Sequence, residues 1–218
     1  MKATDRNIIM ITAGGVGQRF GSNMPKQYVE IGGRQVISYV IEACKGSTMA
    51  DGIIVVAHPN YHDELRARYG VDVVASGAEL NITKRNGLDY IRRHSDCEKL
   101  VVVDAVRPAV ESHVIDRFFK LLDDYDAVAN ARKITDSLGR YGQWIVNREE
   151  YYTLSTPEGF RFSLIDEHFK ADSPLTESIQ QLPPTSQVYL DFDAPYYDKL
   201  TYPEDLAKIQ SILSQRNR

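Results

Sequence analysis

The chain has 218 residues, of which 43% are hydrophobic and 26% charged, so residues 1–218 can bury the core of one large α/β domain. A formal net charge of -4 argues against nucleic acid or an anionic membrane as a partner, so any anion site must be local. The two cysteines, Cys44 and Cys97, form no CxxC pair, so the sequence indicates neither a disulfide framework nor a zinc site. The apolar run near the amino terminus is too short for a signal peptide or membrane span, so we expect a cytoplasmic protein.

Strands and helices are expected to alternate along the first half of the chain. Short, β-branched apolar runs predict buried strands at residues 7–12, 52–57, 71–74 and 100–103. Amphipathic or polar segments predict helices at residues 35–44, 61–69, 81–94 and 111–124. This βα alternation predicts an α/β fold with three layers, α/β/α, around a mostly parallel, Rossmann-like sheet.

The pattern loosens between Asp126 and Tyr152, which predicts an irregular excursion from the sheet instead of another βα unit. Within it, residues 131–152 are expected to form a protruding arm that packs on a partner subunit. Beyond two consecutive prolines the pattern regains order, with a strand at 187–192 and a helix at 204–215 that Pro203 opens.

A glycine-rich loop follows the first strand directly, with the sequence AGGVGQRFG at residues 13–21 and MPKQY at 24–28. Glycines allow backbone N–H groups to approach a polyphosphate closely, and Arg19 and Lys26 add positive charge. Neither a Walker A loop nor a GxGxxG dinucleotide fingerprint fits the spacing. A plain turn would have no use for both cations, so the loop predicts a triphosphate cradle.

Asp104 ends a strand that we expect near the sheet centre, where α/β folds bind ligands. One carboxylate suits Mg²⁺, which completes its shell with phosphate oxygens and water. The alternative roles for Asp104 are a helix N-cap or an ion pair with Arg107.

Five segments occur together in the order and approximate spacing of a known family: AGGVGQRFGSNMPKQY, VVVDAVRPAV, ITDSLG, VNREEYYTLSTPEGF and KLTYPEDL. The chain resembles the bacterial cytidylyltransferases that act on methylerythritol 4-phosphate and on ribitol 5-phosphate. The resemblance implies a glycosyltransferase-A-like nucleotidyltransferase fold with a dimerisation arm. It also implies CTP and a small polyol phosphate as substrates, Mg²⁺ as cofactor, and a homodimer.

The resemblance assigns the nucleotide site residue by residue. Arg19 and Lys26 would stabilise charge at the α-phosphorus, Lys199 would neutralise the triphosphate, and Asp104 would bind the metal. The remaining residues implied in CTP binding are Ala13, Gly14, Gly15, Val16, Gly17, Gly77 and Thr83, together with Asp104.

The acceptor site is assigned in the same way. Arg107 and Ser137 would contact the substrate phosphate, and Arg148 would act catalytically by reaching the substrate phosphate of the neighbouring subunit. A second metal carboxylate is ambiguous between Asp193 and Asp198.

Two regions depart from the family pattern. In the segment that holds the cytosine and ribose in the family, Thr83 can replace the Ser hydroxyl. The position of the family's Arg is occupied by Leu80, unless Arg85 takes over its role from a displaced position. On the acceptor side, Ser137 replaces a Thr, and Thr176-Glu177-Ser178 replaces a Thr-Asp-Glu run. These changes favour an acceptor similar to ribitol 5-phosphate. Methylerythritol 4-phosphate, another sugar phosphate, a phosphonate, and a non-catalytic nucleotide-binding protein remain the alternatives.

Overall fold

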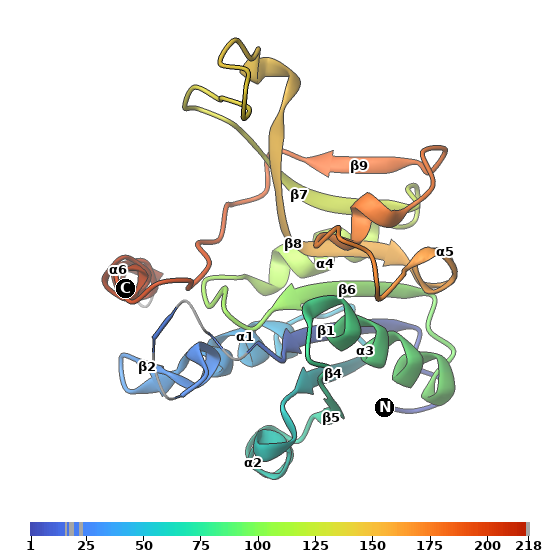
Figure 1. Ribbon diagram of the computed structural model, residues 1–218. Helices are drawn as coiled ribbons and strands as arrows, with labels where there is room; N and C mark the ends of the chain where they lie inside the picture. The colour runs from blue at the N-terminus through green and yellow to red at the C-terminus, as the bar shows by residue number, and fades with distance from the viewer. Residues whose placement is uncertain (16, 18–19, 22–23, 217–218) are drawn as a thin grey trace.

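The computed structural model describes residues 1–15, 17, 20–21 and 24–216. Its centre is a seven-stranded sheet in the order β5-β4-β1-β6-β8-β7-β9 (Figure 1). The four predicted strands of the first half are present as a parallel group: β1 (Asn7–Ala13), β4 (Gly52–Ala57), β5 (Asp72–Ala75) and β6 (Lys99–Asp104). The prediction of a mostly parallel sheet is confirmed.

The second half of the sheet differs from the expectation. The structure forms β7 (Ala127–Lys133) at the start of the irregular excursion predicted between Asp126 and Tyr152, and β8 (Tyr152–Arg161), which was not predicted, follows it. The prediction was wrong for residues 127–133, because the small residues of AVANARK give little periodicity and a bulge interrupts the register at Ala129/Asn130. The predicted late strand is β9 (Val188–Asp191), which runs parallel to β7, while β8 is antiparallel to both β6 and β7.

Helices cover both faces of the sheet, which confirms the three layers (Figure 1). The α-helices are α1 (Val36–Lys45), α2 (His62–Tyr69), α3 (Leu80–His94), α4 (Ser112–Leu121), α5 (Phe162–His168) and α6 (Asp205–Arg216). Short elements are a hairpin of β2 (Glu30–Ile31) and β3 (Arg34–Gln35), and 3-10 turns η2 (Lys26–Tyr28), η3 (Pro59–Tyr61), η4 (Arg148–Glu150) and η5 (Ser178–Gln181). Helix α5 and the hairpin were not predicted.

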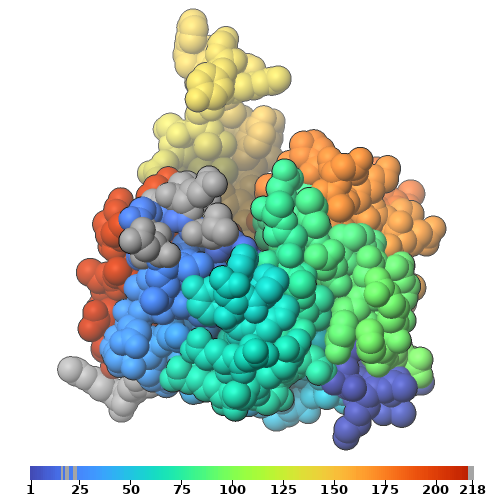
Figure 2. All heavy atoms as spheres, turned by 60° about the horizontal axis from the view of Figure 1, so that its bottom comes forward, coloured from blue at the N-terminus to red at the C-terminus, as the bar shows by residue number. Residues whose placement is uncertain are grey.

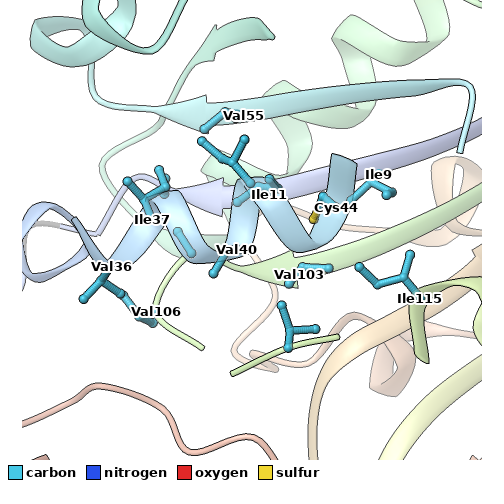
Figure 3. Packing of buried hydrophobic residues seen from close by; sticks show 14 of the residues in the cluster. Ile9, Ile11, Val36, Ile37, Val40, Cys44, Val55, Val103, Val106 and Ile115 are labelled. Carbon is cyan, nitrogen blue, oxygen red and sulfur yellow. The ribbon is translucent and has the colours of Figure 1, made fainter. Parts of the chain in front are cut away.

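Alternation along β1 explains why the sheet is buried on both faces. Ile9 and Ile11 pack into the cluster formed with α1 and α4 (Figure 3), whereas Ile8 and Met10 pack into the cluster with α3 and α5. Such a strand has a continuous apolar run because successive side chains point to opposite faces.

The order of the strands creates a binding crevice at one edge. The chain passes from β1 to β4 and β5 on one side, then returns to form β6 on the other side of β1. Thr12 and Asp104 are register partners where β1 and β6 end. Crossovers diverge at this point, which is where open α/β sheets bind ligands.

An arm rises from the distal ends of β7 and β8, as the yellow segment in Figures 1 and 2 shows. Its irregular part spans residues 134–151, because both strands extend into the predicted range of 131–152. Tyr141, Trp144 and Ile145 are 106%, 85% and 78% exposed. Among the described residues, no helix is long and apolar enough to cross a membrane.

Gly87 provides a test of how closely α3 packs on the sheet. A Cβ at Gly87 would lie 2.3 Å from Met10 Sδ and 2.9 Å from Val56 Cγ2, both in the core. We expect Gly87→Ala to lower the free energy of unfolding by about 1–3 kcal/mol, since this clash exceeds the gain in helix propensity. Urea denaturation measures the effect. The control is Gly139→Ala, where a Cβ meets nothing within 4 Å; equal effects of the two substitutions would contradict the packing argument.

Candidate active site

A cavity of about 200 Å³ lies where β1 and β6 end and α3 begins. It therefore occupies the crevice that the strand order creates. Its lining comes from the glycine-rich loop, η2, the segment before α3, the end of β6 and the segment before α6. The lining residues are Thr12, Ala13, Gly14, Gly15, Lys26, Gln27, Gly77, Ala78, Glu79, Leu80, Thr83, Asp104, Val106 and Lys199.

Gln27 holds the glycine-rich loop in shape. Its buried side-chain amide donates to the backbone oxygens of Ala13 at 2.7 Å and of Gly15 at 2.9 Å. Gly14 lies so close to α3 that a Cβ there would be 2.5 Å from Ser76 Cβ and 2.8 Å from Thr83 Oγ1. Gly14 is therefore required for this close approach.

The structure brings most of the predicted nucleotide residues to this cavity. Ala13, Gly14, Gly15, Lys26, Gly77, Thr83, Asp104 and Lys199 all line it. Gly17 lies in the same loop and has a φ of 72°, which favours glycine. Val16 and Arg19 lie outside the described residues. Gln27 belongs to the quoted motif, but its buried amide's role in shaping the loop was not predicted.

Asp104 is the charged centre of the cavity. One carboxylate oxygen accepts from the Thr12 hydroxyl at 3.1 Å, and the other lies 2.9 Å from Lys199 Nζ and 3.6 Å from Arg107 Nε. Burial alone would raise the pKa of Asp104, but the positive charges of Lys199 and Arg107 outweigh it and hold the pKa well below its usual value. Asp104 is therefore a carboxylate at neutral pH.

Arg107 is buried behind Asp104 and does not line the cavity. Its guanidinium donates to the backbone oxygen of Tyr197, and it is 6% exposed. The ion pair with Asp104 that the sequence offered as an alternative is thus present, with a long separation of 3.6 Å. The contact expected between Arg107 and a substrate phosphate stays a prediction.

The residues of the cavity fit a cation that is bound partly by the protein and partly by the oxygens of a polyphosphate. Within the described part of the chain, no three His, Cys, Asp or Glu side chains are grouped to hold a metal on their own. Asp104 faces the cavity beside the glycine-rich loop, and Mg²⁺ is typically held by one or two carboxylates plus substrate phosphates. Neither candidate for a second carboxylate, Asp193 or Asp198, is among the described residues of the lining, and Asp198 pairs with Lys208 at 2.7 Å.

The base-binding side differs from the expectation at one residue. Thr83 Oγ1 accepts from the backbone N–H of Gly77 at 3.1 Å, so the hydroxyl orders the segment before α3. The Arg85 guanidinium donates to the carboxylate and backbone oxygen of Asp166, which lies in α5. Arg85 is therefore not a displaced base-binding arginine, whereas Leu80 lines the cavity.

Ser137 and Arg148 lie in the arm and not in the lining of the chain's own cavity. Both are exposed, and the Arg148 guanidinium donates to the backbone oxygen of Thr135 and to Glu149. The structure therefore does not bring these two residues together with Asp104 and Lys199 within one chain.

A buried ion pair next to the cavity was not predicted. Lys84 Nζ lies 3.7 Å from Glu158 Oε2, and the two side chains are 2% and 0% exposed. Glu177 lies close to this pair, and its burial, together with the negative charge of Glu158, raises the pKa of Glu177 to about 7. The signal available in the sequence is a lysine and a glutamate inside segments that otherwise form the core.

Comparisons with known proteins identify the family of the chain. Residues 7–215 match the family model described as IspD: 2-C-methyl-D-erythritol 4-phosphate cytidylyltransferase. The chain is 33% identical over 171 residues to the 2-C-methyl-D-erythritol 4-phosphate cytidylyltransferase of Porphyromonas gingivalis, covering 74% of this chain and 75% of that protein. It is 26% identical to the protein of the same name from Clostridium botulinum, covering 96% and 98%.

Solved structures show the same fold. The crystal structure of 4-diphosphocytidyl-2C-methyl-D-erythritol synthase from Anaerococcus prevotii superposes with a TM-score of 0.81 at 22% identity, covering 96% of each chain. The fold, the residues that line the cavity and the match along nearly the whole chain lead to one conclusion: the chain belongs to the IspD family and is a nucleotidyltransferase of the cytidylyltransferase type.

Proposed function

We propose that this protein transfers the cytidylyl group of CTP to 2-C-methyl-D-erythritol 4-phosphate, with Mg²⁺ as cofactor. The family match and the relatives' names support this acceptor, which was the alternative to the ribitol 5-phosphate-like acceptor expected from the sequence. The observation that carries the proposal is the pairing of Lys199 with Asp104 beside the glycine-rich loop, at the point where the crossovers diverge.

The reaction requires no residue of the protein as nucleophile. An oxygen of the acceptor phosphate attacks the α-phosphorus of CTP, a new P–O bond forms, and the bond to the β-phosphate breaks to release pyrophosphate. Lys26 and Lys199, which both line the cavity, would neutralise the charge that builds up during this step. Arg19 would add a third cation from the same loop. The backbone of Gly14 and Gly15 would orient the triphosphate.

Asp104 would hold the cation, which when bound neutralises phosphate charge and fixes the geometry of the α-phosphate. The low pKa of Asp104 suits this role because the carboxylate stays ionised and ready to bind a cation. A general base is unnecessary because the acceptor phosphate is already an anion. Lys199 and Arg107 would balance the buried Asp104 charge whenever the cation is absent.

We infer that the protein acts as a homodimer whose arms complete the acceptor sites. Tyr141, Trp144 and Ile145 give the arm an exposed apolar surface that a second copy would cover. Ser137 and Arg148 would then contact the acceptor phosphate of the partner subunit. This arrangement accounts for their position outside the cavity of their own chain.

One observation favours ribitol 5-phosphate as the second candidate acceptor. Ser137 and Glu177 are the positions where the chain departs from the family pattern on the acceptor side. The charges of Asp104 and Lys199 act on Glu177, so this carboxyl group would influence which hydroxyl groups of the acceptor are bound.

Pyrophosphate release measures the proposed activity directly. We expect release with Mg²⁺, CTP and methylerythritol 4-phosphate, and at least about tenfold less with ATP, GTP or UTP, since a pocket built for one base rejects others. The same assay is run in parallel with ribitol 5-phosphate as the acceptor. A higher kcat/KM with ribitol 5-phosphate would identify ribitol 5-phosphate as the acceptor in place of methylerythritol 4-phosphate. The absence of pyrophosphate release with every pair of substrates would contradict the proposed function.

Lys199 tests the electrostatic part of the mechanism. We expect Lys199→Met to lower kcat by roughly a hundred- to a thousandfold, because one charge donor at the reacting phosphate is removed. The matched control is Lys208→Met in α6, whose ammonium pairs with Asp198 and is exposed. Steady-state kinetics of the folded variants measure both effects, and a Lys199→Met enzyme as active as the Lys208→Met control would remove Lys199 from the mechanism.

Mixing two inactive variants tests the role of Arg148 across the dimer. Lys199→Met and Arg148→Ala subunits, each inactive alone, are expected to recover about a quarter of the wild-type rate when subunits exchange at equal concentrations. The reason is that half of the dimers are mixed and each has one intact site. No recovery, despite mixed dimers observed by native mass spectrometry, would place Arg148 outside the partner's site.

A further inference from the structure

The buried pair of Lys84 and Glu158 joins three separate elements beside the cavity. Lys84 lies in α3 and Glu158 in β8, and each also binds the segment of residues 173–179. Lys84 Nζ donates to the backbone oxygen of Thr176 and to the Ser178 hydroxyl, both at 2.8 Å. The two carboxylate oxygens of Glu158 accept from the backbone N–H groups of Ser178 at 3.2 Å and Ile179 at 3.1 Å.

A third contact anchors the same segment to the first turn of α3. The Asn81 amide donates to the backbone oxygens of Ser173 at 2.9 Å and Leu175 at 2.8 Å. The segment from residue 173 to 179 is therefore held by side chains on both sides of Glu177. Since the neighbours Thr176 and Ser178 are fixed, the position of the Glu177 backbone is fixed as well.

The pair is also connected to the catalytic cavity. Thr83, the neighbour of Lys84, lines the cavity, and Thr156, two residues before Glu158, accepts from the backbone N–H of Asp104 at 3.3 Å. The charges of Asp104 and Lys199 also act on the Glu177 carboxyl group. Because Lys84, next to the cavity-lining Thr83, binds both chain neighbours of Glu177, Glu177 lies beside the cavity wall.

A buried ion pair is a poor source of stability, because removing two charges from water offsets most of their attraction. At 3.7 Å between Lys84 Nζ and Glu158 Oε2, the direct attraction is weaker than in a close pair, while the four hydrogen bonds to residues 176, 178 and 179 have ordinary lengths. Lys84 and Glu158 therefore interact more strongly with residues 176–179 than with each other. This distribution points to a positioning role.

We propose that Lys84 and Glu158 are positioning residues that hold residues 173–179 so that Glu177 faces the acceptor and binds its hydroxyl groups. The inference rests on the proposed function for the identity of the acceptor. The chemical class it names is a polyhydroxylated phosphate, whose hydroxyl groups can donate to a carboxylate. Lys84 and Glu158 themselves touch no substrate.

Steady-state kinetics that measure the KM for the acceptor and the KM for CTP separately test this proposal. We expect Lys84→Met, Glu158→Gln and Glu177→Gln each to raise the KM for the acceptor at least about tenfold, as losing a charge-assisted hydrogen bond does, with less than about a threefold change in the KM for CTP. Because Lys84 acts through Glu177, the Lys84→Met/Glu177→Gln variant is expected to show no further increase beyond the larger single effect.

The matched control is Lys99→Met. Lys99 is a half-buried lysine at the opposite end of β6, and its ammonium likewise binds a backbone oxygen, that of Phe119, and a carboxylate, that of Asp123. We expect its acceptor KM to equal that of the wild type.

Hydrogen–deuterium exchange provides a readout that does not depend on turnover. The amides of Ser178 and Ile179 are expected to exchange faster in Glu158→Gln, and not in the Lys99→Met control. Unchanged exchange would overturn the positioning role, whatever the activity. A wild-type protein that is inactive with every acceptor would contradict the proposed function alone.

The Lys84→Met/Glu158→Gln variant distinguishes positioning from simple stability. Removing both partners eliminates the uncompensated buried charge, so the thermal midpoint should recover toward that of the wild type. The acceptor KM should stay raised, because the segment has still lost contacts. Recovery of both quantities together, or a KM for CTP that rises as much as that of the acceptor, would show that the pair is merely structural.

Discussion

The structure around the active site depends on one buried carboxylate. Asp104 is 7% exposed at the carboxyl end of β6, where an uncompensated negative charge would be costly. Lys199 and Arg107 supply the compensation, from a distant segment and from the turn after the strand. The need to neutralise Asp104 therefore brings together parts of the chain that are far apart in sequence.

This constraint also fixes the path of the chain before α6. Arg107 binds the backbone oxygen of Tyr197, and the backbone N–H of Leu200 donates to the oxygen of Val106 at 2.9 Å. Lys199, between these two anchors, is held against Asp104. The contacts that balance the charge of Asp104 without a ligand thus also position the Lys199 ammonium group beside the glycine-rich loop, where it would neutralise a bound triphosphate.

The sequence predicted the parallel half of the fold well because strong local signals coincide there. Runs such as NIIMIT and GIIVVA are buried on both faces, and the glycine-rich loop follows the first of them. The signal failed at β7, whose small residues carry little periodicity, and at α5, whose few turns show no clear apolar stripe. In both regions tertiary packing determines the structure more than local propensity does.

The site was predictable to a similar degree. Motifs located Lys26, Asp104 and Lys199, since these residues have a recognisable local setting or match a family position. Lys84 and Glu158 could not be paired from the sequence, because their meeting depends on how α3 packs against the sheet that contains β8. The separation of Arg148 from the cavity likewise depends on the direction of the arm.

A crystal structure of the protein with CTP and Mg²⁺ would show whether Asp104 organises the nucleotide site. We expect the triphosphate to lie between the glycine-rich loop and Lys199, with the cation bound to Asp104. A triphosphate bound at another edge of the sheet, or a cation held by carboxylates remote from Asp104, would contradict this expectation.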